Sequence, residues 1–304
     1  MTKPSYDLIV IGEGISGLTS AGHAASAGLS VATFESDFFG GLVANVNEVE
    51  DFSEGPAVSG MDLAADLKKA NAKARVASIQ ELVAEIRGDD RRFEIVTERG
   101  QYDARAVVIA SGARLKKLGV PGEDTFEGRG VSHCADCDGP LFHNEDVVVV
   151  GGGDSAAQQA LVLAPMCRSV RLIHNGKHLH AQPNFVQRVS AERKIFVIDE
   201  STVESILGSK SVEGVRVRSV ADGAVHEVPC AGVFAYIGLN PRSQFAPRSV
   251  LRDPYGYLIV DQQFETTHRG IWAIGQVRSG YSGLLRDAVV EAKQVANIVR
   301  GRLA

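Results

Sequence analysis

The chain of 304 residues has few cysteines, no long hydrophobic run and no excess of positive charge. Four cysteines are too few for the disulfide framework of a secreted domain. No stretch approaches the roughly 18 apolar residues that indicate a membrane span, and the first apolar run is too short for a signal peptide. A net charge of −5 gives no footprint for nucleic acid or an anionic membrane. We therefore expect a cytoplasmic protein that binds neither.

The composition is that of a globular protein, with 44% hydrophobic and 23% charged residues. No low-complexity tract or long linker interrupts the chain. Its length suits two domains of ordinary size, each with its own core.

A glycine-rich motif, GEGISG at residues 12–17, follows a short apolar run at residues 6–11. Apolar residues then recur at helical spacing as far as Gly28, and a second apolar run at residues 31–34 ends at Glu35. In a Rossmann unit such glycines allow a tight turn, close approach of the backbone to a pyrophosphate and close contact between helix and strand. The order of strand, glycine loop, helix, strand and acid predicts a dinucleotide-binding unit.

The same unit recurs later, with GGGDSA at residues 151–156 between apolar runs at residues 147–150 and 170–173. The spacing matches, because 23 positions separate Gly12 from Glu35 and also Gly151 from His174. Two loops of this kind predict two nucleotide sites, typically one for a flavin and one for a nicotinamide.

We expect an α/β fold of two Rossmann-like, three-layer domains, the second inserted into the first. Strand-like runs at residues 257–260 and 271–275 and an amphipathic helix at residues 284–300 follow the second unit. They would rejoin the first domain, which would then comprise residues 1–116 and 242–304. The inserted domain would comprise residues 117–241.

A CADCD box at residues 134–138 lies shortly before the second glycine loop. Two cysteines separated by two residues can close a small disulfide that exchanges electrons with cellular thiols, and an adjacent acid can move the proton. The alternative is half of a zinc site, but Cys167 and Cys230 are isolated in apolar segments, where we expect core thiols. The box predicts a redox-active pair, and we expect no metal site.

Taken in order, these motifs resemble the low-molecular-weight thioredoxin reductases over nearly the whole chain. The resemblance rests on residues 128–138 and 147–156, on residues 40–42 and 47–52 as a flavin loop, and on residues 233–241. It implies a homodimeric FAD enzyme that reduces thioredoxin or another disulfide. Cys137 would receive electrons from the flavin, Cys134 would attack the substrate disulfide, and Asp138 would be the general acid/base.

The resemblance also implies two sets of cofactor-binding residues. Those expected to bind FAD are Gly12, Gly14, Ser16, Gly17, Glu35, Ser36, Gly41, Leu42, Asn47, Ala110, Ser111, Gly112, Gly275, Gln276, Arg286, Asp287 and Ala288. Those expected at the nicotinamide nucleotide site are Gly151, Gly153, Asp154, Ser155, His174, Lys177, His178 and Gly238.

The nicotinamide site departs from the family pattern. Members that use NADPH carry an arginine pair and a further arginine just after the second strand of this unit, whereas residues 174–180 here read HNGKHLH. Lys177, His178 and His180 hold a phosphate more weakly than arginine does. The stretch also lacks an Asp or Glu that could bind the ribose diol of NAD. The sequence thus leaves NADPH use in doubt and does not support NAD.

A second departure is at the flavin. Gln276 stands where the family has an Asp that bonds the ribityl chain, and Asp287 stands where it has Gln near the flavin ring. Because Gln both donates and accepts hydrogen bonds, we expect FAD to bind with an altered potential. The electron partner stays open between NADPH, reduced ferredoxin or flavodoxin, and oxygen for a dithiol oxidase. A non-catalytic flavin-binding redox sensor is a further alternative.

Overall fold

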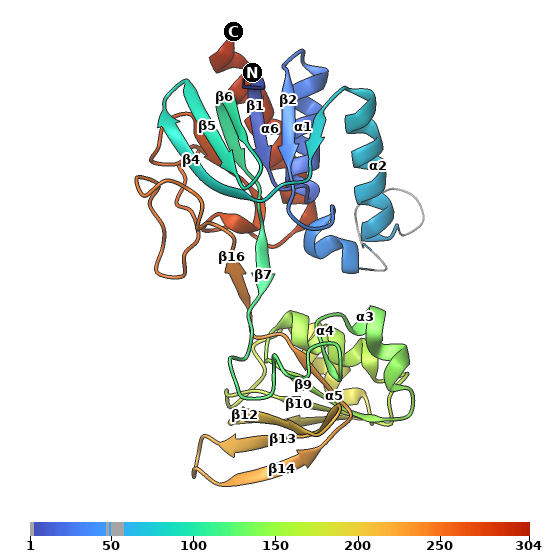
Figure 1. Cartoon of the computed structure of the whole chain (residues 1–304). Coiled ribbons are helices and arrows are strands. Elements are labelled where there is room, and N and C mark those ends of the chain that lie inside the picture. The colour runs from blue at the N-terminus through green and yellow to red at the C-terminus, as the bar shows by residue number, and fades with distance from the viewer. Residues whose placement is uncertain (1–2, 47–48, 50–57) are drawn as a thin grey trace. The chain divides into compact units, whose positions relative to one another are not determined.

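The computed structural model describes residues 3–46, 49 and 58–304 of the chain (Figure 1). The chain divides into two compact units, residues 1–114 with 240–304 and residues 115–239. Two short strands, β7 (Ala113–Leu115) and β16 (Leu239–Pro241), pair where the chain passes from one unit to the other. The sequence-based domain limits, and the nucleotide assigned to each domain, stay predictions.

The first unit is built on a seven-stranded sheet in the order β3-β2-β1-β6-β5-β4, with β17 paired to β6. Its parallel strands are β1 (Ser5–Ile11), β2 (Val31–Phe34), β3 (Ala77–Ile79), β6 (Gln101–Ile109) and β17 (Ile271–Ala273). The antiparallel edge is β4 (Val83–Asp89) and β5 (Arg92–Thr97). The helices are α1 (Ile15–Ser26), α2 (Gly60–Lys73) and α6 (Leu285–Leu303), with short 3-10 turns η1 (Gly41–Asn45) and η3 (Gly275–Val277).

Alternating residues of β1 send their side chains into two separate cores. Leu8 and Val10 pack with residues of α1 and α6, whereas Ile9 and Ile11 pack on the opposite face with β2, β4 and β5. Successive side chains of a strand point to opposite faces of the sheet, so an uninterrupted apolar strand needs cover on both sides. The run at residues 6–11 therefore specifies a central strand.

The second unit has three layers. Its parallel sheet has the order β11-β10-β9-β15-β8. The strands are β8 (Val131–Ser132), β9 (Asp146–Val150), β10 (Ser169–Ile173), β11 (Ile195–Ile198) and β15 (Gly232–Ala235). The helical elements are α3 (Ala135–Asp138), η2 (Gly139–Phe142), α4 (Asp154–Leu163) and α5 (Pro183–Ala191). The antiparallel layer is β12 (Ser201–Gly208), β13 (Val212–Ser219) and β14 (Val225–Pro229).

Strand β9 again divides two cores. Val147 and Val149 pack with α4, and Val148 and Val150 pack with the antiparallel layer. The predicted α/β class, with two Rossmann-like parallel sheets and the second unit inserted into the first, is confirmed. One expected strand is absent: residues 257–260 make only isolated bridges.

No helix in the part of the chain that the structure describes has the length and apolar character needed to cross a membrane.

Candidate redox and nucleotide sites

The predicted redox pair forms a disulfide on the short helix α3. Cys134 occupies the N-cap and Cys137 lies within the helix, with 5.3 Å between their Cα atoms. The Cys137 amide donates to Cys134 Sγ at 3.2 Å. Cys137 is exposed on this unit and Cys134 is half-buried. The two cysteines therefore differ in their exposure to solvent.

Asp138 is fixed beside this pair by Ser132, a residue that sequence reasoning did not single out. The Ser132 hydroxyl donates to Asp138 Oδ2 at 2.6 Å and accepts from the Cys134 amide at 3.2 Å. Ser132 is buried at the end of β8, so its hydroxyl has a fixed position. The predicted acid/base residue is thus tied to the backbone of the first cysteine.

The other two cysteines are buried in cores, as expected for structural thiols. Burial raises the pKa of the Cys167 thiol to about 11 and that of Cys230 to about 12. Both therefore stay protonated near neutral pH and are poor nucleophiles. Within the described ranges, no group of three or more His, Cys, Asp or Glu side chains is placed to hold a metal ion.

The first glycine loop is packed as tightly as the predicted nucleotide-binding turn requires. Gly12 has a φ of +109°, and a Cβ on it would overlap the Ala110 carbonyl at the end of β6. A Cβ on Gly17 would overlap the carbonyl of Gly12, so only glycine lets α1 approach the strand this closely. Gly14, at the start of α1, instead faces open space, since a Cβ on it would meet no atom within 4 Å beyond its own chain neighbours. Such a space at a helix N-terminus suits a phosphate.

Other predicted FAD residues surround this loop. Gly40 bridges to Gly14, Gly41 lies against it, and Gly275 lies against Ser16. Ser111 and Gly112 come soon after β6 in the chain, and both bond to the backbone of Arg242. Arg286, Asp287 and Ala288 lie in the first turn of α6, whose Leu285 packs against the start of α1. Leu42 lies in η1, and Asn47 falls outside the described residues.

Glu35 directly follows β2, and the ribose of a bound nucleotide is expected near its carboxylate. It accepts from the amide of Glu13 at 3.0 Å and from those of Ser36 and Asp37 at 2.9 and 3.0 Å. The backbone amides thus fix this carboxylate at the loop. The glycine cradle and the fixed acid together fit the dinucleotide part of FAD.

The Gly275 amide, next to Gln276, is bonded to a buried ion pair that sequence reasoning missed. Glu291 of α6 accepts from the Gly275 amide at 3.0 Å and from Arg278 Nε at 3.1 Å, and it also pairs with the terminal nitrogen of that guanidinium. The Arg278 guanidinium lies over the rings of Phe264 and Tyr281. The backbone around Gln276 is therefore fixed before any ligand arrives.

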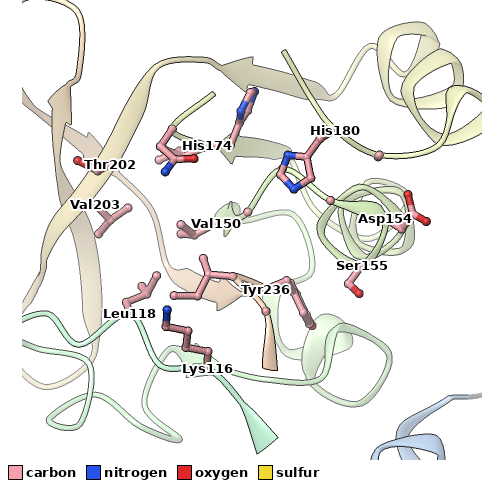
Figure 2. Close-up of a pocket in the computed structure, with 18 of the residues that line it drawn as sticks. Lys116, Leu118, Val150, Asp154, Ser155, His174, His180, Thr202, Val203 and Tyr236 are labelled. Carbon is pink, nitrogen blue, oxygen red and sulfur yellow. The ribbon is translucent and has the colours of Figure 1, made fainter. Parts of the chain in front are cut away.

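The second glycine loop lines a cavity of about 840 Å³ that lies entirely within the second unit (Figure 2). Six predicted nucleotide residues line it: Gly151, Gly153, Asp154, Ser155, His174 and Gly238. Lys177 and His178 are not among its lining residues, whereas Lys116 and His180 are. The His180 ring lies against Gly152 and Gly153, and its amide donates to the Gly152 carbonyl at 2.9 Å. Asp154 accepts two hydrogen bonds from Gln182, one from the Gln182 backbone amide at 2.6 Å and one from the Gln182 side chain at 2.7 Å.

Comparison with known proteins agrees with this architecture. The family model described as pyridine nucleotide-disulphide oxidoreductase matches residues 6–295. The thioredoxin reductase of Treponema pallidum is 36% identical over 278 residues, which cover 91% of this chain and 90% of that protein. The chain belongs to this family, and within it is a thioredoxin reductase-like FAD oxidoreductase.

Solved structures agree as well. The crystal structure of Lactococcus lactis thioredoxin reductase superposes with a TM-score of 0.92 at 32% identity, covering 98% of this chain and 99% of that one. A ferredoxin-flavin thioredoxin reductase from Clostridium acetobutylicum superposes with a TM-score of 0.54 at 26% identity, with 99% of each chain covered.

Proposed function

We propose that this chain passes electrons from bound FAD, through the Cys134–Cys137 bridge, to the disulfide of thioredoxin or a similar substrate. The observation that carries the proposal is a disulfide on α3 with an acid fixed beside it. Its thioredoxin reductase relatives support thioredoxin as the substrate class. The family resemblance also supports a homodimer.

The cysteine chemistry follows from thiol–disulfide exchange. In the reduced pair, the Cys134 thiolate attacks one sulfur of the substrate disulfide and forms a mixed disulfide, while the other substrate sulfur leaves as a thiolate. Asp138, fixed by Ser132, gives that leaving sulfur its proton. The Cys137 thiolate then attacks Cys134 Sγ, which re-forms the bridge and releases the reduced substrate.

FAD supplies the two-electron chemistry that reduces the pair. We assign its dinucleotide part to the first glycine loop and to Glu35, and its ribityl contacts to the segment at Gln276. The other residues proposed to contact it are those expected from the sequence. Glu291 and Arg278 would hold the backbone of that segment in place.

The electron donor is proposed from the family and from the residues that line the second cavity. NADPH is the donor expected from the family, but no arginine is among the described residues that line the second cavity. The similarity to a ferredoxin-flavin thioredoxin reductase favours reduced ferredoxin as the second candidate, with flavodoxin as a related one. A dithiol oxidase that passes electrons to oxygen is the reverse use of the same cysteines.

One experiment tests the donor and the function. The purified yellow protein is kept anaerobic and mixed with a small excess of NADPH, NADH, reduced ferredoxin or a dithiol while the flavin band is followed. Bleaching by NADPH, followed by reduction of thioredoxin, supports the first proposal. Bleaching by NADH followed by reduction of thioredoxin supports the same function with the other nicotinamide, whereas bleaching by ferredoxin or dithiols but by neither nicotinamide supports the second. A flavin that changes redox state but never turns over a disulfide would refute both.

A further inference from the structure

The carboxyl end of β10 is occupied by a buried histidine bonded to a carboxylate from the neighbouring strand. His174 is 3% exposed and lines the cavity. Its Nδ1 accepts from the Gly176 amide at 3.2 Å, so the ring hydrogen is on Nε2, which donates to Asp199 Oδ1 at 2.6 Å. In a dinucleotide fold this strand end meets the adenosine ribose.

Asp199 reaches this position through the sheet. β10 and β11 are parallel, with Ile173 paired to Ile198, so the residues that follow them emerge at the same edge. The turn after β11 is bonded back to β10: the Ser201 amide donates to the His174 carbonyl and the Glu200 amide to the Gly176 carbonyl, each at 2.9 Å. The carboxylate is therefore held at the strand end.

The charges around the cavity do not suit a second phosphate on that ribose. Lys116 is the one lysine or arginine among the lining residues that the structure describes. A 2′-phosphate needs cationic donors, and arginine provides them best because its fork bonds two oxygens at once. Asp199 does not line the cavity, but its carboxylate is bonded to His174, which does, and its negative charge there would repel such a phosphate.

We propose that the second site takes an adenine dinucleotide without a 2′-phosphate, of the NADH class, in preference to NADPH. His174 lines this site, and Asp199, bonded behind it, is a positioning residue that sets the charge there. The proposal depends on the proposed function only in that the second unit retains a nucleotide site. The stretch at residues 174–180 lacks an acid, and Asp199, which follows the neighbouring strand β11, supplies the negative charge instead.

Two ligands that cannot transfer a hydride test the proposal. The flavin-loaded protein is titrated calorimetrically with ADP-ribose and with 2′-phospho-ADP-ribose. The expected result is at least roughly tenfold tighter binding of ADP-ribose, since the charged contacts that favour a phosphate are replaced by a repulsive one. Equal binding of the two ligands, or tighter binding of the phosphorylated one, overturns the proposal.

Asp199→Asn removes the charge but keeps an oxygen that can accept from His174. We expect this variant to bind 2′-phospho-ADP-ribose more tightly and to lose most of the discrimination. Asp222→Asn, in the exposed loop between β13 and β14, changes the net charge of the same unit equally. This control should leave the discrimination between the two ligands intact. Discrimination that is unchanged in a folded Asp199→Asn variant would refute its role.

The wild-type comparison does not depend on any variant folding. If neither ligand binds while dithiols still reduce the flavin, this inference fails and the proposed function stands. If ADP-ribose binds selectively but no disulfide is turned over, the proposed function fails and the nucleotide preference stands.

Discussion

The two units are alike at the amino ends of their strands. In each, an Asp on the first strand accepts from a Ser beside the second strand and from an Arg. The groups are Asp7, Ser30 and Arg105 in the first unit, and Asp146, Ser169 and Arg168 in the second. Burial opposes ionisation of Asp7, but its hydrogen bonds outweigh that effect and lower its pKa; the hydrogen bond from Arg168 lowers the pKa of Asp146 to about 2.

At the carboxyl ends the units differ. Glu35 ends the second strand of the first unit and is held by three backbone amides. His174 ends the matching strand of the second unit and is held by Asp199. The amino ends stabilise the strand pair, whereas the carboxyl ends are where we propose that the nucleotides bind. A shared fold can therefore keep its stabilising contacts while its ligand changes.

The largest expected effect concerns the cysteine pair of the second unit and should leave the proposed flavin site of the first unit intact. Cys137→Ser removes a sulfur from the bridge, so disulfide turnover should fall to background while the FAD spectrum stays. Stopped-flow absorbance and a thioredoxin reduction assay measure the two properties. Cys167→Ser, at a buried thiol, is the matched control and should keep turnover. Full activity of Cys137→Ser would contradict the proposed mechanism.

Gly14→Ala tests whether the open space at the first loop belongs to a ligand. The new methyl meets no protein atom beyond its chain neighbours, so the melting temperature of the flavin-free protein should be unchanged. It would crowd a bound pyrophosphate, and we expect FAD affinity to fall about tenfold, as overpacking by one methyl implies. Gly301→Ala, also with open space, is the control. Unchanged FAD affinity, measured by fluorescence quenching, would argue against the assigned site.

Arginines at the second loop should restore the contacts that a 2′-phosphate needs. Asn175→Arg with His180→Arg adds two guanidinium groups at residues that line the cavity. NADPH affinity should rise about tenfold, because charge-assisted hydrogen bonds each contribute about 1.5–3 kcal/mol before ordering costs. His178→Arg adds the same group at a residue that does not line the cavity and should change affinity much less. Equal gains in both proteins would indicate a general charge effect.

The smallest effect concerns stability. The pKa of Asp146 in the folded protein is about 2, below its ordinary 3.8, so its stabilisation is present above about pH 4 and is lost as the pH falls towards 2. Asp146→Asn should cost about 1 kcal/mol at pH 7, since exposed partners weaken the pair. The variant and wild type should converge in acid. Urea unfolding at several pH values measures this, and a gap independent of pH would contradict it.

Local sequence predicted a large part of the architecture and of the redox centre. Apolar runs marked β1, β2, β9 and β10, and glycines marked the turns, because both signals depend on neighbours along the chain. The CADCD spacing predicted the disulfide for the same reason. The run at residues 257–260 misled, because its bridges to residues 252, 266 and 278 do not extend into a ladder.

What the sequence determined by itself is thus the two repeated nucleotide folds and the bridging cysteines, whose geometry follows from spacing of a few residues. Only the tertiary structure decided that Asp199 meets His174, that Glu291 holds the segment of Gln276, and that Ser132 fixes Asp138. The physical reason is that most of these contacts join different elements across a sheet or between a helix and a loop. Hydrogen bonds of that kind depend on packing direction and register, which single-sequence patterns do not carry.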